Sequence, residues 1–383
     1  MKPEEYLAAL RNSMVLRRPE QERFGVVTKE QMAEYFRRRV LEDADDAESL
    51  ISLAPERSLH ELLQEVERAS GHSLLLDLAL RSTFQEVHQV TLELAEFANK
   101  SPLELPTLAS LPTFEPNACT LRVPGSRDVI VAFADGLPLF LSLIAKALVR
   151  VYEEISPEEL AEQHSRSDWP DVCLSFMKQA ISDLEEEWIR FAVIVGSFVR
   201  ASKPPLKRRP LNAASDMLRS FLITGAERFI MGHEYGHIYL GHSGLACVSE
   251  TMEIYDTKVE VLRRDQGQEY AADVVGRNLS LVLAAKDWLR GGSKPRPDCY
   301  AIEVAGPSLF FTAAEILDDA RALLPNPPPR LDSHPPHEER LRVMELAYGA
   351  ATGWPENLYA VEVRAILRAL WERAHPICQE MLA

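Results

Sequence analysis

The sequence predicts an α+β fold that is predominantly helical. Apolar residues recur every three or four positions over most of the chain after Gly136, as amphipathic helices require. One short segment instead has the pattern of a β-hairpin, with TLRV (120–123) and DVIVAF (128–133) on either side of the turn residues PGSR. The chain has 383 residues, of which 46% are hydrophobic, so it can bury a large core. We therefore expect a small sheet beside many helices.

The first part of the chain predicts a helical region that is set apart from the rest. Residues 28–100 show helical periodicity with many charges, and the proline-rich stretch SPLELPTLASLPTFEPNA (101–118) then breaks the pattern. We interpret 101–118 as a linker between an N-terminal helical region of unknown role (1–110) and the core of the protein (118–350).

The core is expected to be mainly helical after the hairpin. GLPLFLSLIAKALV (136–149) is shorter than a membrane span and carries Lys146, so we predict a buried core helix. KVEVL (258–262) indicates a short extended segment, PNPPPR (325–330) ends a helix, and 351–383 forms a C-terminal helix that packs on the core. Periodicity places the helices at 137–153, 171–200, 213–242, 266–290, 300–323, 337–348 and 356–381.

Charge and cysteine usage favour a soluble cytoplasmic protein. The formal net charge of −16 repels nucleic acids and anionic membranes, so neither is an expected partner. The five cysteines are scattered and contain no CxxC pair, which fits a reducing compartment. The polar start, MKPEEYLAALRNSM, contains no secretory signal, and no membrane span is expected.

HEYGH (233–237) is the strongest chemical motif. His233 and His237 lie one helical turn apart on one face, so two imidazole nitrogens can bind one metal ion. Glu234 projects beside that ion, where it can take a proton from a metal-bound water. Gly236 lets another helix approach closely. The alternative is a polar helical face with partly exposed histidines.

A third ligand is expected in EYAADVVG (269–276). Glu269 and Asp273 share a helical face among small and apolar neighbours, and buried carboxylates need partners. Glu269 can bind the metal, while Asp273 can accept the ring N–H of a ligand histidine. His242 lies five residues after His237, so on a continuing helix it would point away and pack beside the site.

With SHPPHEER (333–340), these motifs form the series HExxH, ExxADxxG and SHPxxxxR, which resembles the M48-type zinc metallopeptidases among the gluzincins. The resemblance covers roughly residues 120–350. The short gap of 31 residues between His237 and Glu269, and the lack of membrane spans, are similar to soluble branches such as the phage-exclusion and ImmA-like peptidases. SHPP alone would also fit a helix-entry turn, with Ser333 as the cap.

The resemblance implies a soluble endopeptidase with one Zn²⁺ per chain, and a protein or peptide as substrate. Glu234 is then the general base, and His334 or Tyr270 stabilises the oxyanion. Arg340 either orients His334 or binds a substrate carbonyl or carboxylate. The hairpin at 120–133 would offer an edge strand to an extended substrate.

Two other readings remain open. One is a catalytically silent or latent zinc-binding sensor or interaction protein, including a redox-switched form in which Cys247 closes the metal site. Structural zinc sites are usually rich in cysteine, which disfavours this reading. The other is a protein without metal. Any regulatory partner would bind through the N-terminal helices.

Overall fold

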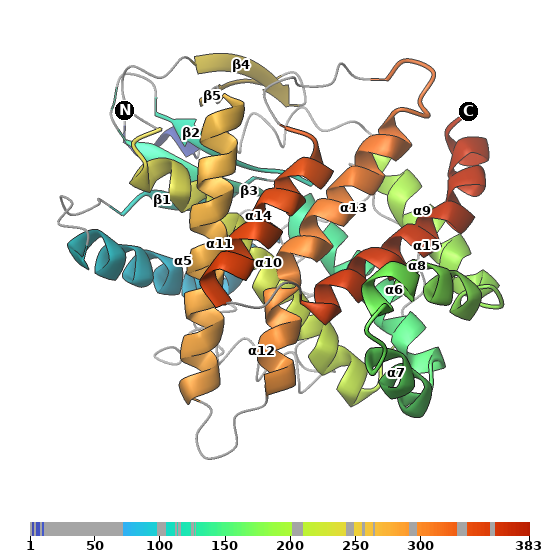
Figure 1. Cartoon of the computed structure of the whole chain (residues 1–383). Helices are drawn as coiled ribbons and strands as arrows, with labels where there is room; N and C mark the ends of the chain where they lie inside the picture. Colours follow the sequence, from blue (N-terminus) through green and yellow to red (C-terminus); the bar gives the residue numbers. More distant parts are fainter. Residues whose placement is uncertain are drawn as a thin grey trace, which may run out of the picture.

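Figure 1 shows the computed structural model of the chain. Most of the predicted N-terminal helices, Cys247, Ser333 and His334 lie outside the residues that the structure describes. The described residues are 2, 3, 5–7, 10, 72–97, 105–111, 113, 116–123, 126, 128–200, 210–242, 249–254, 257–262, 265–290, 297–327, 335–352 and 357–383.

A five-stranded sheet forms one end of the molecule, with the strand order β1-β3-β2-β5-β4. The predicted hairpin is confirmed as β2 and β3, and the extended segment KVEVL is confirmed as part of β5, whereas β4 was not predicted. β1 is parallel to β3, and the other neighbours are antiparallel. The strands are β1 Thr107–Leu111, β2 Ala118–Arg122, β3 Val129–Ala134, β4 Ser249–Ile254 and β5 Thr257–Leu262.

β1 corrects the interpretation of residues 101–118 as a linker. Pro106 and Pro112 flank the strand TLASL and do not interrupt it, so its backbone can pair with β3. β3 is buried on both faces. Ile130 and Ala132 pack in a cluster with Leu7, whereas Val131 and Phe133 face the helical core.

Helices make up the rest of the described fold, and α7 is the one helix from Gly136 onward that was not predicted. Their bounds are α5 His72–Phe97, α6 Gly136–Glu154, α7 Pro157–His164, α8 Trp169–Ala180, α9 Glu185–Val199, α10 Ala213–Tyr239, α11 Gln266–Arg290, α12 Pro297–Val304, α13 Gly306–Arg321, α14 His337–Thr352 and α15 Leu358–Leu382.

Two segments that were each predicted as one helix form two separate helices. The predicted helix 171–200 breaks between α8 and α9, where Ser182 and Asp183 can bond to nearby backbone, and three glutamates then fill the favourable first turn of α9. The predicted helix 300–323 breaks at Ala305, because Pro307 occupies the first turn of a new helix, α13.

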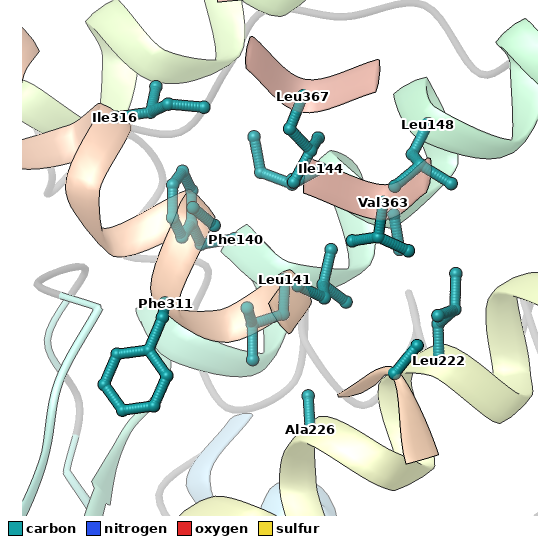
Figure 2. Packing of buried hydrophobic residues seen from close by; sticks show 14 of the residues in the cluster. Phe140, Leu141, Ile144, Leu148, Leu222, Ala226, Phe311, Ile316, Val363 and Leu367 are labelled. Carbon is teal, nitrogen blue, oxygen red and sulfur yellow. The ribbon is translucent and has the colours of Figure 1, made fainter. Parts of the chain in front are cut away.

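α10 is the central helix and packs against α5, α6, α11, α12 and α13. The prediction that 136–149 is a buried core helix is confirmed by α6. Among the described residues, one apolar stretch, Tyr300–Arg321, is long enough to cross a membrane. In its most apolar 18 residues, 67% are buried inside the protein, as in core helices. Figure 2 shows the α6 residues Phe140, Leu141, Ile144 and Leu148 among Leu222 and Ala226 of α10, Phe311 and Ile316 of α13, and Val363 and Leu367 of α15.

Arg228 joins α10 to three neighbouring helices. Its side chain is only 5% exposed, and it contacts Glu303 of α12, Asp287 of α11 and Glu86 of α5. The Nη2 atom lies 2.6 Å from Asp287 Oδ2 and 2.8 Å from Glu86 Oε2. Burial opposes the charge of Arg228, but the carboxylates outweigh it and raise the pKa of the guanidinium.

We expect Arg228→Met to lower the free energy of unfolding by about 3–5 kcal/mol, because the buried Glu303 carboxylate would lose its counter-charge. Urea unfolding followed by circular dichroism measures the loss. The matched control is Lys178→Met, which removes a pair with Glu372 whose members are 43% and 53% exposed, and should cost less than about 1 kcal/mol. Equal losses in both variants would contradict a stabilising role for the Arg228 cluster.

Candidate metal centre

The site forms where α10 and α11 cross with their backbones in close contact. A Cβ atom on Gly236 would lie 3.0 Å from Cα of Ala272, and one on Gly276 would lie 2.7 Å from the backbone nitrogen of His233. The distance at Gly276 is shorter than real Cβ contacts, so a side chain there would force the helices apart, and the distance at Gly236 is tighter than nearly all such contacts. The prediction that Gly236 admits a neighbouring helix is confirmed. The close approach brings the carboxylates of α11 onto the histidines of α10.

Three buried side chains could together hold a metal ion. His233 and His237 project from one face of α10, and Glu269 reaches them from the first turn of α11. One donor atom from each lies within 4.8 Å of the others. The two Nε2 atoms are 3.1 Å apart, and the Glu269 oxygens lie 3.4 Å from Nε2 of His237 and 3.5 Å from Nε2 of His233. Two imidazole nitrogens and one carboxylate oxygen are a donor set that fits a divalent transition metal.

Asp273 orients His233, as the sequence predicted. Its Oδ1 atom lies 2.8 Å from Nδ1 of His233. Burial raises the pKa of the Asp273 carboxyl, but Arg340 and His233 outweigh this effect and lower it. The carboxylate is therefore ionised, and Nδ1 of His233 donates its proton to it. The lone pair of Nε2 then points to the other ligands, which is the tautomer that metal binding needs.

His242 contacts His237 on the side away from the ligands. The predicted helix 213–242 ends earlier, at Tyr239, and Gly241 adopts a positive φ of 77° that turns the chain back. The two Nδ1 atoms of His237 and His242 lie 3.1 Å apart. Burial lowers the pKa of His237 to about 4, although a hydrogen bond to Glu269 opposes it. His237 is therefore neutral at pH 7, and His242 supports its ring without joining the donor set.

Glu234 is held by a residue that the sequence did not single out. The Thr120 hydroxyl, on β2, donates a short hydrogen bond to Oε2 of Glu234. Both side chains are buried, at 5% and 6% exposure. Glu234 directly follows His233 on α10, so the contact with β2 holds it next to a donor residue. Thr120 was visible in the sequence as a hairpin residue, but nothing in the spacing linked it to Glu234.

Arg340 contacts the carboxylates of the site, a role that neither prediction named. Its Nε and Nη2 atoms donate to both oxygens of Asp273, at 2.8 and 2.7 Å, and Nη2 lies 3.4 Å from Glu269. At 5% exposure, the guanidinium is buried against these carboxylates. It neutralises two acids that would otherwise be buried with too little positive charge.

No described contact brings Tyr270 or His334, the two residues predicted to stabilise the oxyanion, to the three residues that could hold a metal ion. Tyr270 follows Glu269 on α11 but is only partly buried, and its side chain is directed at α14. Burial and a hydrogen bond with Glu339 raise the pKa of its hydroxyl. His334 lies outside the described residues.

The predicted edge strand is also corrected. β2 pairs with β3 on one side and with β5 on the other, where Leu121 is opposite Val261. Among the described strands, β1 and β4 form the edges of the sheet, and the hairpin strands β2 and β3 lie inside it. β5 was predicted as an extended segment, but its partner could not be read from its sequence.

We expect the purified protein to bind about one zinc ion per chain, and Glu269→Ala to weaken binding strongly because one of three donors is lost. Asp273→Asn should weaken binding by about 10–100-fold, because it affects the His233 tautomer and not a donor atom. Equilibrium dialysis with elemental analysis measures both. His375→Ala, on the distant α15, is the control. Unchanged affinity in Glu269→Ala would remove Glu269 from the donor set and restore His242 as a candidate.

No protein-family model, curated protein or solved structure matches this chain. The resemblance indicated by the three motifs therefore stays a prediction. The description of the site rests on contacts within the chain itself.

Proposed function

We propose that this protein is a soluble, cytoplasmic, zinc-dependent endopeptidase. The observation that carries the proposal is the placement of Glu234. It directly follows a ligand histidine, it lies beside a buried group of two histidines and one glutamate, and a threonine from another element fixes its carboxylate. A metal site that only stabilises a fold has no need of a positioned carboxylate that is not a ligand.

The donor set favours zinc among the transition metals. Two histidines and a glutamate leave a coordination position for water, as in catalytic zinc sites. Zinc bound there would supply Lewis acidity, which lowers the pKa of water and polarises a peptide carbonyl. No cysteine belongs to the described donor group, which disfavours a purely structural zinc site.

The chain's own groups then account for the proton transfers. Thr120 occupies Oε2 of Glu234, so Oε1 is the atom that receives the proton of the attacking water. The same oxygen delivers that proton to the amine that leaves when the peptide bond breaks. Asp273 keeps His233 in the ligand tautomer, and Arg340 keeps Asp273 ionised.

A latent form of the same enzyme, or a metal-dependent sensor, is the second candidate. It is favoured by burial, since His233, Glu234, His237 and Glu269 are 8%, 6%, 2% and 1% exposed. A peptide could reach these groups only if neighbouring segments moved. In this second function the metal would change a conformation or a binding partner, and no peptide bond would be cut.

Glu234→Gln separates the two candidates. The amide cannot accept the proton of water, so cleavage should fall by about 10²–10⁴-fold while zinc content stays unchanged. Comparing the cleavage products in cells that carry the wild type or Glu234→Gln would also identify substrates. Glu338→Gln, an exposed carboxylate on α14, is the control and should leave the products unchanged. If the wild type and Glu234→Gln give identical products, the endopeptidase proposal is wrong.

Thr120→Val tests the contact between the sheet and Glu234. Valine keeps the shape of the side chain but removes the hydroxyl that holds Oε2. With a peptide identified in the preceding comparison, we expect kcat to fall by about tenfold, which corresponds to roughly 1.4 kcal/mol of lost transition-state stabilisation, with KM and zinc content little changed. An unchanged kcat would show that Thr120 does not position the base.

A further inference from the structure

Arg277 is a buried arginine that the proposed function does not use. It lies on α11 one turn after Asp273 and two turns after Glu269, on the same face of the helix. Arg277 is as buried as Arg340, and each residue is 5% exposed. Arg277 therefore follows Glu269 and Asp273 of the candidate metal centre along one face of α11.

The environment of Arg277 differs from that of the other two strongly buried arginines. Arg228 contacts three carboxylates, and Arg340 is bidentate on Asp273. Arg277 pairs with no carboxylate among the described residues. Its Nη1 donates to the Val304 carbonyl at 2.5 Å, and its guanidinium lies 5.0 Å from the centroid of the Tyr348 ring.

These two contacts satisfy few of the N–H donors of the Arg277 guanidinium. An arginine has five N–H donors, and the buried Nε of Arg277 has no hydrogen-bond partner in the part of the chain that the structure describes. Burial lowers the pKa of Arg277 to about 10, against a small opposing effect of Tyr348. At pH 7 the side chain nevertheless stays protonated, so a full positive charge lies in the interior without a described counter-charge. Such a charge is costly unless an anion accompanies it.

Arg277 lines a small cavity between α11, α13, α14 and the start of α15. Ser308, Tyr348 and Asn357 also line it, and the remaining walls are mainly apolar. Asn357 is used elsewhere, because it caps α15 and donates from Nδ2 to the Ala301 carbonyl. The carboxylate of Glu345 reaches the wall as well, but it forms an ion pair with Arg364.

The cavity is small, which limits what it can hold. The volume of the cavity is about 20 Å³. A cavity of roughly 10–15 Å³ can hold one water molecule. A nucleotide or a peptide is therefore too large, whereas a halide ion or a single carboxylate group is of suitable size.

We propose that Arg277 and its cavity form a binding site for a small monovalent anion. The anion would accept hydrogen bonds from Nε of Arg277 and from the Ser308 hydroxyl, and it would supply the missing counter-charge. Because the cavity joins α11 to α13 and α14, the bound anion stabilises the contact between these helices. The same two helices, α11 and α14, carry Asp273 and Arg340, one turn away.

Thermal unfolding in different anions tests the site. At constant ionic strength and pH, sodium gluconate is replaced stepwise by sodium chloride, bromide or acetate. We expect the small anions to raise the Tm of the zinc-loaded wild type by about 2–4 °C at saturation. Arg277→Met should lose this increment. Arg342→Met, which removes an exposed arginine from α14, should keep it.

The pattern of responses decides both the site and its ligand. A response to halides assigns a halide, and a response to acetate alone assigns a carboxylate. If Arg277→Met does not fold, crystals of the wild type soaked in bromide replace it, and an anomalous peak within hydrogen-bonding distance of the Arg277 guanidinium supports the site. The proposal is overturned if the Tm of the wild type is the same in gluconate and in every small anion, if Arg277→Met keeps the increment, or, where that variant does not fold, if neither bromide nor acetate binds at Arg277.

Discussion

The crossing of α10 and α11 is the contact on which the rest of the site depends. Side chains are absent at Gly236 and Gly276, so the two backbones approach within the distance that a Cβ atom would need. This approach places Glu269 and Asp273 directly over His233 and His237, in an environment that excludes most water. Buried carboxylates require hydrogen bonds or positive charge, which His233 and Arg340 supply to Asp273 and which a metal ion could supply to Glu269. Arg340 comes from α14, so the same electrostatic requirement also fixes a third helix.

Buried arginines extend this principle through the helical core. Arg228 links α10 to α5, α11 and α12 through three carboxylates, and Arg340 links α14 to α11 through two. In both cases the ion pairs cross between helices that are far apart in the sequence, and their cost of burial is offset by several hydrogen bonds. Arg277 has the burial of these residues but no described acid partner. This difference, more than its cation–π contact with Tyr348, is what makes Arg277 a candidate ligand-binding group.

The sheet contributes to the site through one residue. β2 lies inside the sheet between β3 and β5, and Thr120 on β2 reaches Glu234 of α10. The position of the Glu234 carboxylate is therefore set by the packing of the sheet on the central helix as well as by the helix itself. Pairing of β5 with β2 also covers the strand that would otherwise be open to an extended peptide. Substrate binding along β2, in the proposed endopeptidase, would require β5 to move.

Local spacing in the sequence was sufficient for the helical faces and for the donor set. His233 with His237, and Glu269 with Asp273, are each four residues apart, so each pair had to share a face once its segment was helical. The bounds of α11 and the hairpin of β2 and β3 were predicted for the same reason, because periodicity within one element is a local property. The breaks after α8 and at Ala305 are also local, but the turn and proline signals there were outweighed by a continuous apolar pattern. Only the tertiary structure decided that Arg340 binds Asp273, that Thr120 holds Glu234, that β1 and β5 pair where they do, and that Arg277 lines a cavity without pairing with a described acid. Each of these depends on how two elements distant in the sequence pack together, and spacing within either element carries no information about that.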